Sequence, residues 1–99
     1  MINVQANSND QSSKFDLEVR TKEFSKQVIR LCKKIKISTI SRPIISQLIR
    51  SATSIGANYH EATECNSKKD FKHKVVLSKK EAKETMYWLE MLGEVDEIY

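Results

Sequence analysis

The sequence contains very few turn-forming residues, with two glycines and one proline among its 99 residues. A β-sandwich, a β-barrel or a doubly wound sheet needs turn residues about every 8–12 positions, so this composition disfavours all three. A chain of this length also holds no more than one domain of ordinary size, about 100–150 residues. The scarcity of turn residues therefore predicts an all-α protein built from long helices.

Long apolar runs are also lacking. No stretch reaches the ~18 apolar residues of a membrane-spanning helix, and the start, MINVQANSNDQSSK, lacks the apolar segment of a secretory signal. A chain without an export signal keeps its thiols reduced, so we expect Cys32 and Cys65 to be free, on helix surfaces or in the core. The sequence thus predicts a cytoplasmic protein without a membrane segment.

Motifs for chemistry are sparse. Two glycines cannot build a phosphate-cradling loop, and His60, His73, Cys32 and Cys65 show no metal-ligand spacing. We expect both histidines to be solvated on helix surfaces; a Cys65 thiol activated by His60 is a weaker alternative, because it needs an electropositive setting. The sequence therefore predicts no catalytic residues, no metal, no cofactor, no small-molecule substrate and no enzymatic activity.

The first apolar stripe starts after a polar tail. Residues 1–13 are too polar to offset their ordering entropy, so we predict a disordered N-terminal tail and a helical domain over 14–99. A first helix is predicted over about 14–36, where apolar residues recur at helical spacing: Leu17, Phe24, Val28, Leu31 and Ile35.

Two further helices follow. Pro43 is tolerated only in the first turn of a helix, which predicts a second helix over about 41–64. Gly56 weakens that helix by about 1 kcal/mol relative to alanine, so we expect Ala52 and Gly56 to admit a closely packed neighbour. Ser67 and Asp70 resemble a capping box that opens a third helix over about 68–95. Short connections between these helices predict an antiparallel up-down-up bundle.

The third predicted helix carries two apolar stripes. Its main stripe consists of Phe71, Val75, Ser78, Ala82, Met86 and Leu89. A second stripe, predicted to be an oligomer or partner interface, consists of Leu77, Tyr87, Trp88, Met91 and Val95. Because three helices leave this second stripe uncovered, we expect its cover to be another chain or a fourth helix.

The net charge of +4 hides a strong segregation. Residues 14–50 carry ten basic and three acidic side chains, residues 67–80 carry six and one, and residues 81–99 carry one and six. Rows of basic side chains at helical spacing are the candidate nucleic-acid contacts: Lys22, Lys26, Arg30, Lys33, Lys72, Lys79 and Lys83. The alternative is that these lysines only keep a helix surface soluble.

A polar line flanks the apolar stripe of the second helix. Its members are Gln47 and four structural candidates, Arg50, Ser54, Asn58 and Glu61. We expect these side chains to hydrogen-bond neighbouring helices, with Asn58 and Glu61 reaching the third helix. A ligand-binding role is the alternative.

Two stretches carry a resemblance to a known family. The run SQLIRSATSIGANYHEA holds the pattern R-x-A-x-S-I-x-A-N-x-x-E, met by Arg50, Ala52, Ser54, Ile55, Ala57, Asn58 and Glu61. The run SKKDFKHKVVLSKKEAKETMYWLEMLGEV holds S-x-x-[DE]-F and E-T-x-Y-W-L, met by Ser67, Asp70, Phe71, Glu84, Thr85, Tyr87, Trp88 and Leu89. Over about residues 15–95 the chain resembles the 23S rRNA intervening sequence proteins.

The resemblance implies an up-and-down four-helix bundle that assembles as a homopentamer and has no established catalytic activity. A related branch consists of the basic accessory proteins of diversity-generating retroelements, so the resemblance also implies RNA, DNA or a reverse transcriptase as partners. The family's fourth helix would follow residues 94–99, and the chain stops at Tyr99, so we expect three of the four helices here.

Two hypotheses follow from these observations. In the first, the protein is a self-associating, non-enzymatic bundle that binds RNA, or a partner carrying nucleic acid, through its basic surface. In the second, it is a protein–protein interaction scaffold that does not bind nucleic acid directly.

Overall fold

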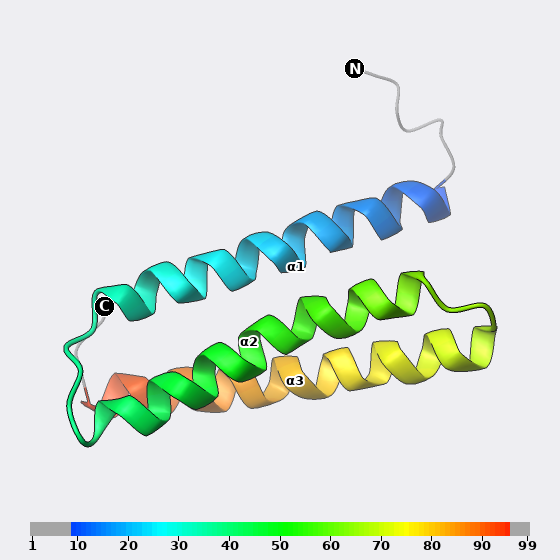
Figure 1. The fold of residues 1–99 in the computed structure, drawn as a ribbon. Helices are drawn as coiled ribbons and strands as arrows, with labels where there is room; N and C mark the ends of the chain where they lie inside the picture. The colour runs from blue at the N-terminus through cyan, green and yellow to red at the C-terminus, as the bar shows by residue number, and fades with distance from the viewer. Residues whose placement is uncertain (1–8, 96–99) are drawn as a thin grey trace, which may run out of the picture.

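The computed structural model describes the backbone of residues 9–95 and the side chains of residues 16–95. It consists of three helices, α1 (Asn9–Lys33), α2 (Ser41–Thr63) and α3 (Lys68–Val95), with no strand among the described residues. The predicted all-α class is confirmed. Figure 1 shows α2 and α3 as an antiparallel pair, with α1 running along α2.

The α1 helix differs from its prediction at both ends. It begins at Asn9, so residues 9–13, which we assigned to the tail, are helical; residues 1–8 lie outside the described part. It ends at Lys33, short of the predicted residue 36, and closes with tighter turns in which Lys34 N and Ile35 N donate to Leu31 O and Cys32 O, at 3.0 and 3.1 Å. The β-branched, serine-rich segment that follows does not continue the helix.

Two serines fix the connection between α1 and α2. Ser38 N donates to Ser41 Oγ and Ser41 N donates to Ser38 Oγ, both at 2.9 Å, while Ser41 Oγ donates to Lys36 O at 2.8 Å. Ser41 is 3% exposed, so its bonds replace water that the backbone has lost. The α2 helix therefore begins at Ser41 with Pro43 in its first turn, as predicted.

The start of α3 also follows the predicted signal. Asp70 N donates to Ser67 Oγ at 3.1 Å, which satisfies one of the free amides of the first turn. Asp70 adds an acidic side chain to that turn, where the helix dipole favours negative charge. The helix begins at Lys68, the predicted residue.

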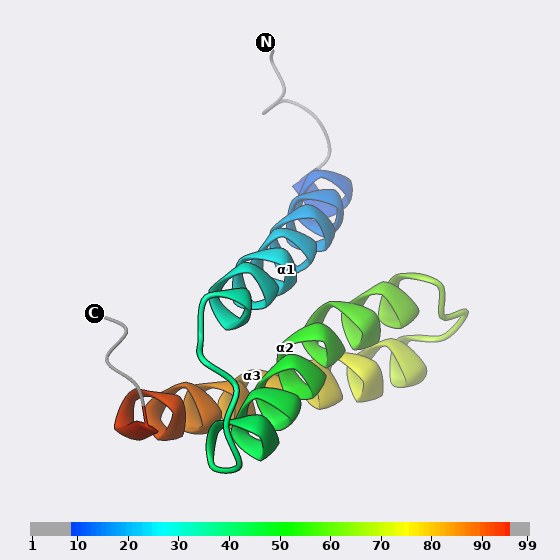
Figure 2. The same cartoon turned by 60° about the vertical axis from the view of Figure 1, so that its left-hand side comes forward.

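The core lies where all three helices meet near the C-terminal end of α1. Its buried members are Val28, Cys32, Ile35, Ile45, Leu48, Ala52 and Leu92. Leu92 is fully buried although neither predicted stripe of α3 included it, and Met86, which the main stripe did include, is 67% exposed. The prediction for Met86 is wrong because α1 packs on α2 and makes few contacts with α3 (Figures 1 and 2).

The predicted close approach at Gly56 is confirmed. A Cβ atom placed there would lie 3.2 Å from Thr21 Oγ1 on α1. One turn earlier, Ser25 Oγ of α1 donates to the carbonyl oxygen of Ala52 at 3.2 Å. Small residues on α2 therefore let α1 approach its backbone.

Candidate functional site

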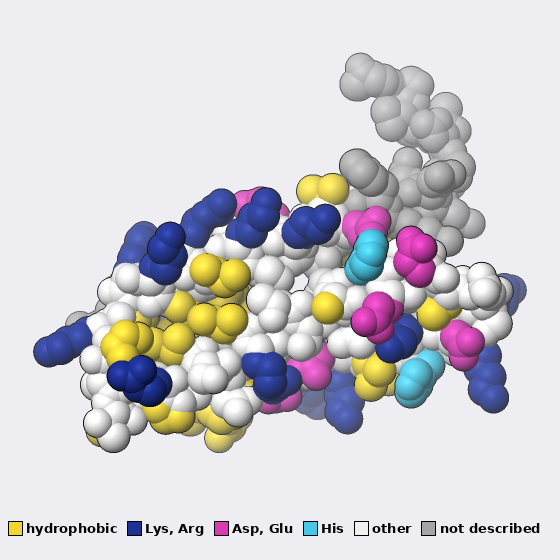
Figure 3. Space-filling view, viewed as in Figure 1, with side chains coloured by type: hydrophobic (Ala, Val, Ile, Leu, Met, Phe, Trp, Pro, Cys, Tyr) yellow, Lys and Arg dark blue, Asp and Glu magenta, His cyan; other side chains and the backbone are white. Residues whose placement is uncertain are grey.

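The basic row of α1 comprises Lys22, Lys26, Arg30 and Lys33, and all four side chains are exposed. Helical spacing places Lys26, Arg30 and Lys33 on the side opposite the buried Val28, while Lys22 borders the hollow between α1 and α2. Figure 3 shows dark blue side chains aligned along α1. Among residues 16–95 only Arg30 of this row pairs with a carboxylate, that of Glu23 at 3.3 Å, so three lysines keep an uncompensated charge.

A second basic row lies on α3 and comprises Lys68, Lys72, Lys79 and Lys83, of which the last three are candidate nucleic-acid contacts. All four are exposed, and none has a carboxylate partner within the described residues. The two basic rows therefore lie on two helices that make few contacts with each other.

Arg50 of the polar line joins α2 to α3. Its guanidinium pairs with Glu81 at 3.1 Å and also with Glu84, and its Nε donates to Gln47 at 2.9 Å. Trp88 Nε1 donates to Glu84 at 2.9 Å. The Trp88 hydrogen bond, together with that of Arg50, lowers the pKa of Glu84 below its ordinary value. Arg50 therefore acts as a cross-helix anchor.

Glu61 makes a second cross-helix contact from the same line. Its carboxylate lies 2.5 Å from Lys74 Nζ of α3, and this hydrogen bond lowers the pKa of Glu61 and raises that of Lys74. Ser54 Oγ donates to Arg50 O at 2.7 Å and Asn58 Nδ2 donates to Ser54 O at 2.9 Å. Ser54 and Asn58 thus bond within α2, and the expected reach of Asn58 to α3 is not observed.

The sequence analysis placed Ser78 on the main stripe of α3 but missed the hydrogen bonds that hydroxyls make between α2 and α3. Thr85 Oγ1 donates to Ser51 Oγ at 2.9 Å, and both residues are at most 1% exposed. Ser78 Oγ donates to Ile55 O at 2.8 Å. The sequence signal for these hydrogen bonds was the presence of small polar residues on the buried side of each helix. In the structure these residues supply hydrogen bonds between the closely packed α2 and α3.

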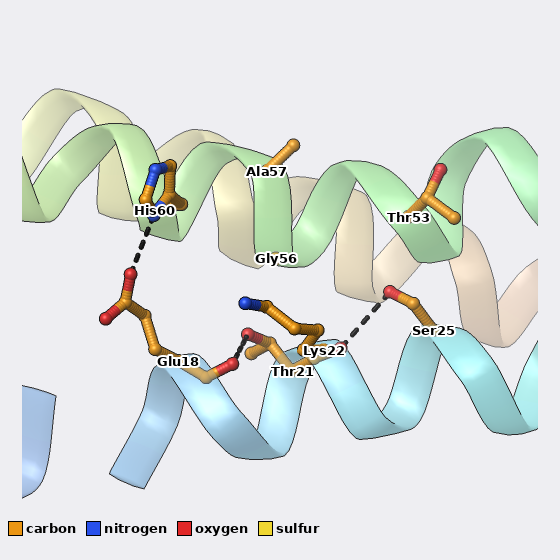
Figure 4. Close-up of a pocket in the computed structure, with 8 residues that line it drawn as sticks. All are labelled: Glu18, Thr21, Lys22, Ser25, Thr53, Gly56, Ala57 and His60. Atoms are coloured by element: carbon orange, nitrogen blue, oxygen red, sulfur yellow. Dashed lines mark hydrogen bonds and ion pairs between the residues drawn. The ribbon is translucent and has the colours of Figure 1, made fainter. Parts of the chain in front are cut away.

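His60 takes part in a contact that the sequence did not reveal. The ring is exposed, as expected, but Nδ1 lies 2.7 Å from Glu18 Oε2 of α1. Figure 4 shows this pair at one end of a hollow of ≈ 270 Å³ between α1 and α2, which Thr21, Lys22 and Ser25 line from α1. The pair therefore links the N-terminal half of α1 to the C-terminal half of α2.

Both cysteines are free, as predicted. Cys32 is buried, and burial raises the pKa of its thiol, which makes it unreactive. Cys65 Sγ donates to Glu61 O at 3.3 Å, while the His60 ring pairs with Glu18, so the two side chains take different partners.

The described residues contain neither a metal-binding cluster nor a membrane-spanning helix. No group of three His, Cys, Asp or Glu side chains in this part is placed to hold a metal ion. None of the helices, over the same residues, combines the length and the apolar content needed to cross a bilayer.

The second apolar stripe of α3 divides into two parts. Trp88 is half-buried and packs against the core, with its ring edge-on to Tyr87 at a centroid distance of 4.9 Å. Tyr87 is 52% and Val95 36% exposed, and Met91 is half-buried between them at helical spacing. We call Tyr87, Met91 and Val95 the outer face of α3. Leu77 is also half-buried.

An apolar groove lies between α1 and α3, with α2 as its floor. It consists of two adjoining hollows of ≈ 450 and ≈ 640 Å³ that share Leu17. Its apolar lining consists of Leu17, Phe24, Ile55, Tyr59, Ala62, Phe71, Val75, Ala82 and Met86. Leu17 and Met86 are 41% and 67% exposed, so this groove is the place where α1 fails to cover α3.

Comparison with known proteins gives a matching family model but no individual relative. Neither the curated proteins nor the solved structures contain a match to this chain. The model of one protein family matches residues 14–98, which include the basic row of α1, the polar line of α2 and all of α3. The chain therefore belongs to the 23S rRNA-intervening sequence protein family.

Proposed function

We propose that the protein is a cytoplasmic, non-enzymatic helical bundle that binds RNA through the basic row of α1. The observation that supports this most is the uncompensated charge of Lys22, Lys26 and Lys33, which are exposed and lack carboxylate partners among residues 16–95. A lysine that pairs with no carboxylate gains most from a phosphate, because no existing ion pair has to break.

The dimensions of the row suit a nucleic-acid backbone. From Lys22 to Lys33 the helix advances about 16 Å, with a cation every turn, which spans several consecutive phosphates. Three of the four side chains are aliphatic ammonium cations, and none of the four has an aromatic ring. A row made mostly of lysines contacts mainly phosphates, so we expect binding that depends on charge more than on sequence.

A salt titration tests this function. The double variant Lys22→Ala/Lys26→Ala removes two phosphate contacts, so the slope of log K against log salt for a labelled structured RNA falls by about 1.4–1.8. The matched control is Lys69→Ala/Lys80→Ala, which removes the same charge from exposed positions of α3 outside both basic rows. An absence of wild-type binding at about 50 mM salt, or an equal loss in the control, overturns the proposal.

A protein-interaction scaffold is the second candidate, and the exposed outer face of α3 favours it. Exposed apolar side chains at helical spacing, Tyr87 at 52% and Val95 at 36%, are typical of helix docking. We also propose that a fourth helical element packs into the α1–α3 groove and completes the four-helix arrangement expected for this family. The homopentamer and the reverse transcriptase partner belong to this candidate as expectations from the family resemblance.

A further inference from the structure

Two oppositely charged side chains of α1 line the hollow between α1 and α2. Glu18 and Lys22 stand four positions apart, and a glutamate four residues before a lysine is the favoured order for an ion pair on a helix. This pair is not formed. Among residues 16–95 Glu18 pairs with His60, and Lys22 pairs with no carboxylate. Figure 4 shows Glu18 joined to the ring of His60, while the side chain of Lys22 is joined to nothing.

The close approach of α1 at Gly56 brings the ring of His60 to Glu18. His60 follows Gly56 by four residues and Glu18 precedes Thr21 by three, so both side chains stand one helical turn beyond the contact of Thr21 with Gly56. Nδ1 of His60 lies 2.7 Å from Oε2 of Glu18. A carboxylate only accepts hydrogen bonds, so the ring donates its Nδ1–H to Glu18. The histidine therefore draws the carboxylate across to α2.

The carboxylate of Glu18 is partly shielded from water. Its side chain is 29% exposed. Burial raises the pKa of Tyr59 on α2, and the charge of Glu18 raises it further, as a carboxylate turned toward α2 requires. Charges that are partly shielded attract their neighbours more strongly than charges in bulk water. Without the imidazole of His60, the ammonium of Lys22 is the cation that Glu18 meets on its own helix.

We propose that His60 is a positioning residue for RNA binding, because its Nδ1–H holds the carboxylate of Glu18 on α2 and leaves the ammonium of Lys22 free for a phosphate. This inference rests on the proposed RNA binding and names a residue that controls one of its phosphate contacts. In this role the ring of His60 acts through Glu18 and makes no contact with RNA. When His60 is removed, Glu18 pairs with Lys22, and a phosphate then has to displace a carboxylate.

A double-mutant cycle with a labelled structured RNA tests this role. At about 50 mM salt, His60→Ala should weaken binding about two- to fivefold, which is the range of an exposed ion pair. Glu18→Gln should restore the affinity in the His60→Ala background and change it little in the wild type. In a Lys22→Ala background, His60→Ala should cause no further loss. The matched control is His73→Ala, which removes an exposed histidine of α3 and should leave the affinity unchanged.

A measurement without RNA separates this inference from the proposed function. Competitive acetylation followed by mass spectrometry compares the amine of Lys22 with that of Lys26, which is exposed and pairs with no carboxylate among residues 16–95. Labelling of Lys22 relative to Lys26 should fall about two- to fivefold in His60→Ala, because an ion pair keeps the amine protonated. It should recover when Glu18→Gln is added.

Three results would overturn the inference. If His60→Ala and His60→Ala/Glu18→Gln lose the same RNA affinity, the pair only holds α1 against α2, or the ring itself contacts RNA. If His60→Ala changes neither the affinity nor the labelling of Lys22, Glu18 does not exchange partners. If the wild type binds no RNA, the proposed function fails and the RNA role of His60 fails with it, while the labelling of Lys22 still shows whether His60 controls the partner of Glu18.

Discussion

Leu92 offers the sharpest test of the fold. It is fully buried and belongs to the cluster that includes Val28, Ile45 and Leu48, so one side chain of α3 contacts the core shared with α1 and α2. Leu17 is the matched comparison, because it is also a helical leucine but is 41% exposed beside the groove. We expect Leu92→Ala to destabilise the protein far more than Leu17→Ala.

The expected magnitudes follow from burial. Leu92→Ala removes three buried carbon groups, about 2.4 kcal/mol of transfer free energy, and leaves a cavity that raises the loss to about 3–4 kcal/mol. Leu17→Ala removes side-chain atoms that are partly solvated and opens no enclosed cavity, so we expect a loss of about 1 kcal/mol. Helix propensity barely differs between leucine and alanine and does not change the ranking.

Urea denaturation followed by helical circular dichroism measures both losses. With an m-value of about 1.5 kcal/mol/M, the midpoint should fall by about 2 M for Leu92→Ala and by less than 1 M for Leu17→Ala. Protein concentration is held constant across the series because self-association adds to apparent stability. If Leu92→Ala does not fold, Leu92→Met keeps most of the volume and should cost less than about 1.5 kcal/mol.

Equal destabilisation by Leu92→Ala and Leu17→Ala would refute the reasoning. That result would mean that Leu17 is as deeply covered as Leu92, so that α1 lies over α3 and the groove is closed.

Two further predictions concern α2 and its contacts. Gly56→Ala should change the free energy of unfolding by less than about 1 kcal/mol, because better helix propensity offsets the contact of a Cβ placed 3.2 Å from Thr21 Oγ1. Gly56→Leu should lower the free energy of unfolding by about 1–3 kcal/mol, as measured by urea denaturation. Equal effects of the two variants would contradict the close approach of α1 at Gly56. The pKa of Glu84 is lowered in the folded state, so its ionised form contributes stability that is complete above about pH 4.5 and is lost as the pH falls through the folded pKa. Glu84→Gln should therefore flatten the decline in melting temperature below about pH 4.5. An unchanged pH profile would contradict the hydrogen bonds of Glu84 with Trp88 and Arg50.

Local signals predicted the helices well. Pro43 placed the start of α2, and Ser67 with Asp70 placed the start of α3, because the requirements of a first helical turn involve only neighbouring residues. The start of α1 was placed too late, since residues 9–13 are polar and carry no apolar stripe to announce a helix. Polar composition argues against burial but does not prevent a helix from extending.

The cross-helix contacts were only partly predictable. Arg50 and Glu61 were expected to meet neighbouring helices, and both do so through charged partners. The pairing of His60 with Glu18 spans 42 positions, and that of Thr85 with Ser51 spans 34. Such pairs depend on how two helices are aligned along their length, which periodicity within one helix does not specify.

The sequence by itself determined three amphipathic helices, the starts of α2 and α3, a basic row on α1 and a reversal of charge along α3. Only the tertiary structure decided which apolar side chains are covered: Leu92 is buried and Met86 is exposed, although both lie on an apolar part of the same helix. The reason is geometric, since helical spacing gives the direction of each side chain while the packing of α1 on α2 decides whether a neighbour stands in that direction.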